Sequence, residues 1–268
     1  MNVRELMTEA YRRNPVLALM GWLHLAMLVV MIGVGFFDGE RTVTGLNPWI
    51  KPSKFAVSIA IYTFTLAWFM PYLAHYRRTV KFISWGTAVV FVGEMICVIS
   101  QAARGVPSHF NISSAYDASV FALMGMLIIF NTLLVLITLF LFFGKTAPLP
   151  PAYLWGIRLG VFLFFIASIE GYAMINNMGH TVGMSDGGAG LPIVNWSTRA
   201  GDLRIAHFLG FHALQILPLA GYIFSRWQAD AVRRRAVAFV LALGLIYFMI
   251  FSLLFLQASH GRPLIAWL

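Results

Sequence analysis

The segment from Ser119 to Phe143 reads SVFALMGMLIIFNTLLVLITLFLFF and contains no charged side chain. An α-helix rises about 1.5 Å per residue, so this segment is long enough to cross the roughly 30 Å hydrocarbon layer of a bilayer. Its amide residue, Asn131, suits a hydrogen bond to a neighbouring membrane helix. The segment therefore predicts a transmembrane helix.

Six further segments have the same apolar character, and together with 119–143 they predict seven spans. They lie near residues 16–36, 55–75, 82–103, 154–177, 205–225 and 235–258. Charged or proline-rich stretches separate them, as expected at helix ends. Residues 1–14 are polar and predict a short amphipathic helix on the membrane surface. We expect one all-α membrane domain over 1–268, built as a seven-transmembrane-helix bundle.

The composition supports a membrane protein. The chain is 60% hydrophobic and only 11% charged, whereas soluble proteins are about 25% charged. The net charge is +9, but the basic residues flank apolar segments, so we expect no nucleic-acid partner. The single cysteine, Cys97, excludes an internal disulfide.

The distribution of Lys and Arg predicts the orientation. Basic clusters such as Arg77–Arg78 and Arg233–Arg235 fall in short loops on the same side as the N-terminus. The positive-inside rule therefore predicts an N-inside, C-outside topology. We expect an integral protein of a bacterial inner (plasma) membrane, with its N-terminus in the cytoplasm and the lipid bilayer around it. A homo-oligomer is compatible with this pattern.

The loops on the opposite side are longer, over residues 37–54, 104–118 and 178–204. Long irregular loops in a compact protein are usually functional or disordered. Trp49 and Trp196 lie within these loops. We expect the loops at 37–54 and 178–204 to form an ordered lid.

Glu94, Glu170 and His212 are three ionisable residues that lie inside predicted spans at a similar depth. Each is six or seven residues from the outer end of its span, which corresponds to a depth of about 10 Å. Ionisable side chains are costly in a membrane helix and usually mark a functional site. The shared depth predicts one polar layer in the outer half of the bundle.

Further polar residues surround that layer. His207 precedes His212 by five residues, which places the two rings about 140° apart around a helix. We expect His212 to face the interior of the bundle. His207, His180 and Arg104 lie near the outer rim, where they are candidates to bind a cofactor. His24 lies deeper, near the middle of the first span.

Carboxylates combined with imidazoles suit zinc, iron or manganese, and imidazole alone suits copper or haem iron. The candidate catalytic residues are Glu94, Glu170 and His212, and the candidate metal ligands are these three together with His207. This set predicts an oxidoreductase-like membrane enzyme that holds a metal ion or haem. Its substrate would be a small molecule or a lipid.

Two other functions fit the same residues. Buried glutamates can bind and release protons in a proton-coupled transporter or permease. Alternatively, the polar layer can be structural, in a protein that assembles with others. No Lys lies inside a predicted span, which argues against a retinal protein, and no P-loop motif supports nucleotide binding.

Overall fold

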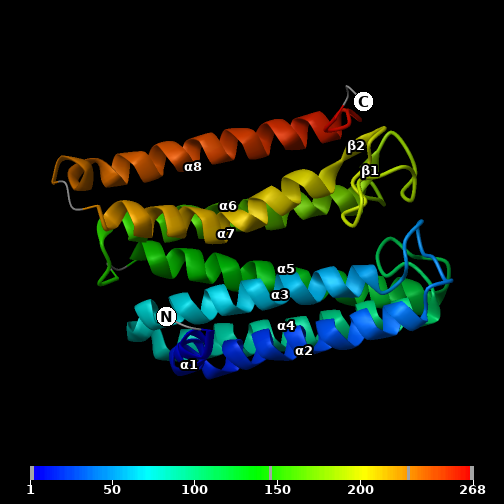
Figure 1. Cartoon of the computed structure of the whole chain (residues 1–268), viewed down its shortest axis with the longest axis horizontal. Helices are drawn as coiled ribbons and strands as arrows, with labels where there is room; N and C mark the ends of the chain where they lie inside the picture. Colours follow the sequence, from blue (N-terminus) through cyan, green and yellow to red (C-terminus); the bar gives the residue numbers. More distant parts are fainter. Residues whose placement is uncertain (1–2, 145–146, 228–229, 266–268) are drawn as a thin grey trace. The chain divides into compact units, whose positions relative to one another are not determined.

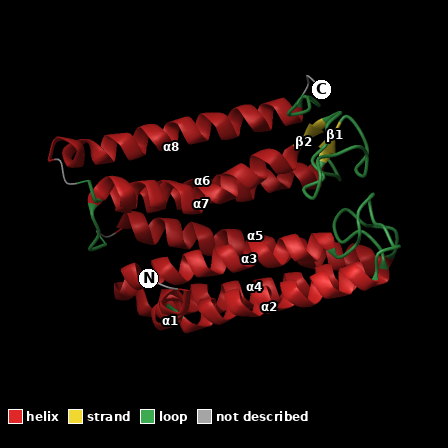
Figure 2. Ribbon diagram, in the orientation of Figure 1, coloured by secondary structure: helices red, strands yellow, loops and turns green. Residues whose placement is uncertain are grey.

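The computed structural model describes residues 3–144, 147–227 and 230–265 (Figures 1 and 2). Its elements, in chain order, are α1 (Val3–Arg13), α2 (Pro15–Phe37), α3 (Ile50–Phe69), the 3-10 helix η1 (Met70–Tyr76), α4 (Arg77–Arg104), α5 (Ala115–Gly144), α6 (Pro151–Asn176), β1 (Thr181–Val182), β2 (Gly201–Asp202), α7 (Leu203–Ser225) and α8 (Asp230–Ser259). Each predicted span overlaps a helix, although the limits of the span at 55–75 differ. The chain is a helical membrane protein: its described residues contain 6 helical stretches long and apolar enough to cross a bilayer.

The longest of these stretches, Ile50–Arg104, covers 55 residues and is not one straight helix. It contains α3, η1 and α4, and its backbone leaves helical geometry at Leu73 (φ −104°, ψ 23°). The chain folds back at this point. As a result, the ring centroids of Tyr62 in α3 and Phe91 in α4 lie 5.4 Å apart. The predicted span 55–75 therefore differs from the structure, in which the α-helix covers Ile50–Phe69.

Two prolines explain this difference. Pro52 lies in the first turn of α3, where a missing backbone N–H breaks no helical hydrogen bond. The helix therefore begins at Ile50, ahead of the charged residues Lys51 and Lys54, whereas the sequence predicts a start near 55. Pro71 has no backbone N–H to donate to the preceding turn, and α3 gives way to η1 at Met70.

The chain divides into two compact units, Met1–Leu134 and Val135–Leu268, which we call the first and second units. In the first unit, α2 and α4 run in the same direction. Asn14 Nδ2 donates to Ser84 Oγ at one end (2.7 Å), and Arg41 Nη1 donates to the Ala103 carbonyl at the other (2.9 Å). Helix α3 runs antiparallel to both.

In the second unit, α6 and α7 pack closely through glycines. Gly156 and Gly160 form a Gly-x-x-x-Gly pattern, which allows two helix backbones to approach each other. A Cβ atom placed on Gly156 would lie 2.4 Å from the carbonyl oxygen of Leu217. Helix α8 is tied to α7 by the Tyr247 hydroxyl, which donates to the Leu209 carbonyl (2.7 Å).

The two long loops, which the structure bounds at 38–49 and 177–202, contain specific polar contacts. In the first, Trp49 Nε1 donates to Asp38 (2.7 Å), and Arg41 forms an ion pair with the same carboxylate. Hydrogen bonds from Arg41 and Trp49 lower the pKa of Asp38 to about 2. In the second loop, β1 pairs antiparallel with β2, with Thr181 opposite Asp202.

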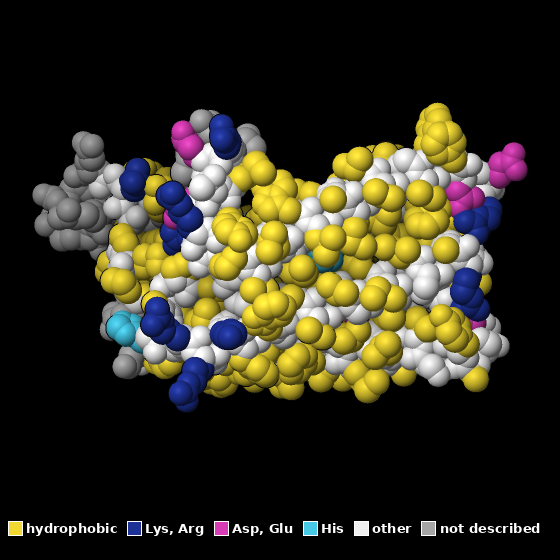
Figure 3. Space-filling view, turned by 90° about the horizontal axis from the view of Figure 1, so that it is seen from below, with side chains coloured by type: hydrophobic (Ala, Val, Ile, Leu, Met, Phe, Trp, Pro, Cys, Tyr) yellow, Lys and Arg dark blue, Asp and Glu magenta, His cyan; other side chains and the backbone are white. Residues whose placement is uncertain are grey.

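Figure 3 shows one face of the molecule in space-filling form. Hydrophobic side chains cover the middle of this face, and Lys and Arg side chains gather toward its ends. Lipid-facing surfaces of membrane proteins have this distribution, because charged groups stay in the interfacial layers.

Candidate functional site

The most deeply buried carboxyl group is that of Glu94, in α4. Its residue has 0% relative exposure. Neither carboxylate oxygen has a hydrogen-bond partner among the described residues. Buried polar groups in native proteins are normally hydrogen-bonded, so an orphaned carboxyl group needs an explanation.

His24 of α2 lies at about the same level as Glu94. Asn14 and Ser84 are hydrogen-bonded and fix the register of the two parallel helices. His24 follows Asn14 by ten residues, and Glu94 follows Ser84 by ten residues, a rise of about 15 Å in each helix. His24 is also fully buried, with 0% relative exposure.

The hydrogen bond of His24 defines its tautomer. Its Nδ1 lies 2.7 Å from the Met20 carbonyl oxygen. A carbonyl can only accept, so Nδ1 carries the hydrogen and Nε2 of the neutral ring presents a lone pair. Nε2 is buried without a partner among the described residues. This nitrogen can accept a proton or coordinate a metal.

Two more polar residues of the first unit, one in α4 and one in α3, accompany Glu94 and His24. Thr87 precedes Glu94 by seven residues and shares its helix face; its hydroxyl is also buried without a partner in the described chain. Lys51, in the first turn of α3, lies close enough to Glu94 for an electrostatic interaction between the two side chains. We call His24, Thr87, Glu94 and Lys51 the first-unit polar set.

The second unit contains a direct contact between a carboxylate and a histidine. His207 Nδ1 lies 3.0 Å from Glu170 Oε2. The Glu170 side chain is 5% exposed and that of His207 is 25% exposed. The other oxygen, Glu170 Oε1, is buried without a partner among the described residues. Gly171 leaves room for the imidazole, since a Cβ there would lie 3.0 Å from His207 Cε1.

His212 differs from the sequence-based expectation. It is partly exposed, and its Nδ1 contacts the Phe208 carbonyl of its own helix (2.7 Å). The imidazole that meets a buried glutamate is instead that of His207. Sequence spacing gives the angle between the two rings, but the packing of α7 against α6 decides which ring points at Glu170.

The other two rim candidates are engaged in ion pairs. His180 lies 2.5 Å from Asp186. Burial alone would raise the pKa of Asp186, but hydrogen bonds from His180 and Thr181 lower it. Arg104 forms an ion pair with Asp117 (2.5 Å). These contacts order the loops and helix ends.

The predicted metal site remains a prediction. Glu94 belongs to the first unit, while Glu170, His207 and His212 belong to the second. Within the described ranges, no group of three or more His, Cys, Asp or Glu side chains is arranged to hold a metal ion.

The sequence pointed to Glu94, Glu170 and His24 but missed their surroundings. The involvement of Lys51 with Glu94 depends on the antiparallel packing of α3 on α4, which no local pattern reveals. A signal for Thr87 existed, because it lies two helical turns before Glu94 on the same face.

Comparison with known proteins gives no further guidance. No protein-family model, no curated protein and no solved structure matches this chain.

Proposed function

We propose that this chain is a proton-translocating membrane protein, of the proton-coupled transporter or permease class. One observation carries the proposal: the oxygens Glu94 Oε1, Glu94 Oε2 and Glu170 Oε1 are buried inside membrane helices without hydrogen-bond partners in the described chain. An unpaired carboxylate is very costly in such surroundings. A carboxyl group there is stable when it holds a proton or when a cation or polar ligand reaches it.

His207 gives the buried acid a route to water. It lies in the second turn of α7, its ring contacts Glu170, and a quarter of its side chain is exposed. An imidazole ring has two nitrogens, so it can take up a proton at one and release a proton from the other. We propose that protons pass between the outer aqueous phase and Glu170 through this imidazole.

The first-unit polar set provides a second exchange site. Glu94 can hold a proton, and His24 Nε2 lies at the same level with a free lone pair. Lys51 approaches from the N-terminal end of α3 and supplies a positive charge near the carboxyl group of Glu94.

We further propose a topology of seven spans with the N-terminus in the cytoplasm of a bacterial cell. A straight helix of 55 residues would be about 80 Å long, far more than a bilayer requires. Two passes, α3 and α4, account for its length. The basic residues near the start of α2 and α4 favour placing those ends inside.

The proposal is tested by proton flux in proteoliposomes with a pH-sensitive dye inside. Under an imposed membrane potential, the wild-type chain should acidify the interior much faster than liposomes without protein. The double variant Glu94→Gln/Glu170→Gln should lose this flux. The variant Glu40→Gln is the matched control, because Glu40 is an exposed loop residue. Equal rates for wild type and the double variant would refute the proposal.

The second candidate is the metal- or haem-dependent membrane enzyme, an oxidoreductase acting on a small or lipophilic substrate. The orientation of His24 favours it, because metal-ligating histidines commonly donate one ring N–H to a carbonyl and present the other nitrogen to the metal. Metal analysis and an absorption spectrum of protein purified in mild detergent test this candidate. Near-stoichiometric metal that disappears in His24→Ala supports it, and unchanged metal content in that variant contradicts it.

A further inference from the structure

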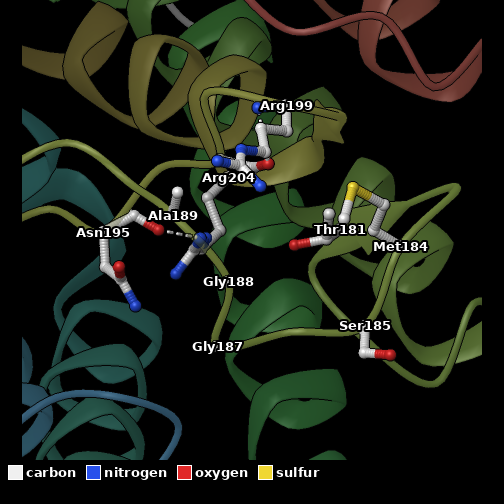
Figure 4. A pocket seen from close by; sticks show the side chains of 10 residues that line it. Thr181, Met184, Ser185, Gly187, Gly188, Ala189, Asn195, Arg199 and Arg204 are labelled. Carbon is white, nitrogen blue, oxygen red and sulfur yellow. Dashed lines mark hydrogen bonds between the residues drawn. The ribbon is translucent and has the colours of Figure 1, made fainter.

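A surface pocket lies in the loop between α6 and α7 of the second unit (Figure 4). Its lining is rich in hydrogen-bond donors and includes Thr181, Ser185, Gly187, Gly188, Arg199 and Arg204. Figure 4 shows the side chains of Arg199 and Arg204 on one side of the pocket and Met184 and Ser185 on the other. Among the described residues, no acidic side chain lines this pocket.

Arg204 is held in place by a buried carboxylate. Its Nε and Nη2 donate to Asp202 (2.9 and 2.5 Å), and Nη2 also donates to the Asn195 carbonyl (2.5 Å). Asp202 is 1% exposed. Nη1 has no hydrogen-bond partner among the described residues, so one edge of this fixed guanidinium group remains available to a ligand.

Arg199 contributes the charge that Asp202 does not neutralise. Its guanidinium group makes no hydrogen bond or ion pair within the described chain, and the residue is exposed at the pocket. Its backbone is ordered, because the amides of Arg199 and Ala200 donate to Ser197 Oγ (3.3 and 3.1 Å). The two arginines and Asp202 together leave one net positive charge at the pocket. The backbone that carries Arg199 is held by hydrogen bonds.

Two backbone donors also line the pocket, at Gly187 and Gly188. The N–H groups of Gly187 and Gly188 make no hydrogen bond within the described chain. Gly187 adopts φ +94°, a left-handed conformation that favours glycine. A Cβ atom on Gly188 would meet nothing within 4 Å, so this position borders open space.

We propose that this pocket binds a small oxyanion, a carboxylate or phosphate group, between Arg199, Arg204 Nη1 and the Gly187–Gly188 backbone. Guanidinium groups and backbone N–H groups are the donors that proteins use for such anions. The anion is either a free solute or the headgroup of an anionic lipid. This proposal does not depend on proton translocation.

The test measures the midpoint temperature at which the protein unfolds in an uncharged detergent. Sodium phosphate and sodium acetate serve as free anions, with sodium chloride at equal ionic strength as the reference. Nanodiscs containing phosphatidylglycerol, compared with phosphatidylcholine nanodiscs, serve as the lipid arm. We expect a concentration-dependent rise of the midpoint for wild type. Arg199→Ala should weaken the apparent affinity about tenfold or more.

Two further variants keep the result interpretable. Gly188→Val adds a branched side chain at a position where a Cβ meets nothing within 4 Å, and it should weaken binding as Arg199→Ala does. Arg262→Ala removes an exposed charge near the same loop, since Gly261 neighbours Gly183, and should bind like wild type. A rise with phosphate or acetate assigns the pocket to a free anion, and a rise only with phosphatidylglycerol assigns it to a lipid headgroup. The proposal is overturned if no anion raises the wild-type midpoint, or if Arg199→Ala responds as wild type does.

Discussion

The variant Glu94→Met is expected to be more stable than the wild-type chain, by about 1–3 kcal/mol in the free energy of unfolding. Glu94 is completely buried and neither oxygen has a partner in the described chain. A methionine of similar length fills the space without leaving a polar group unsatisfied. A residue that weakens the fold is retained for another reason, and proton exchange is the reason proposed.

The matched comparison is Glu170→Met. Glu170 Oε2 lies 3.0 Å from His207 Nδ1, so replacing Glu170 leaves the imidazole of His207 without this hydrogen-bond partner. We expect this variant to be less stable than wild type by about 1–3 kcal/mol. Unfolding in mixed detergent micelles measures both variants. Destabilisation by Glu94→Met would show that Glu94 has a structural role, as in the assembly-protein reading of the sequence.

The second large effect is expected at Gly156. An added Cβ would lie 2.4 Å from the Leu217 carbonyl oxygen and 2.9 Å from Pro218 Cα, both atoms of the α7 backbone. Backbone cannot move aside as a flexible side chain does, so α6 and α7 would have to separate. We expect Gly156→Ala to cost about 3 kcal/mol, at the upper end of overpacking effects.

Gly125→Ala is the control for Gly156→Ala. Gly125 also lies in a membrane helix, but nothing lies within 4 Å of a Cβ placed there. Alanine should be neutral at this position or stabilising by up to about 1 kcal/mol, because it has the higher helix propensity. Equal free energies of unfolding for the two alanine variants would contradict the close packing of α6 on α7.

Much of the fold follows from local sequence. The run from Ser119 to Phe143 lies within α5, because an uncharged apolar segment of that length satisfies its backbone in lipid only as a helix. The limits of α3 did not follow, because charged residues at 51 and 54 obscured a helix that begins at Ile50. Their aliphatic stems and the tolerance for Pro52 in a first turn permit that earlier start.

The candidate site was predictable in part. Buried Glu94 and Glu170 stand out because carboxyl groups are rare in apolar segments. The partner of Glu170 was not predictable from spacing. His207 and His212 sit on different faces of α7, and only the packing of that helix against α6 selects His207. The ion pair of His180 with Asp186 likewise depends on how the loop folds.

The most direct test of the central claim is the infrared absorption of protonated carboxyl groups, measured between acidic and alkaline pH. The chain has only 10 Asp and Glu residues, so the background is small. The account predicts that wild type retains a protonated-carboxyl band at neutral pH. This band should lose amplitude in Glu94→Gln and remain in Glu40→Gln. A wild-type spectrum without such a band at neutral pH, or a band unchanged in Glu94→Gln, would contradict a proton-holding Glu94.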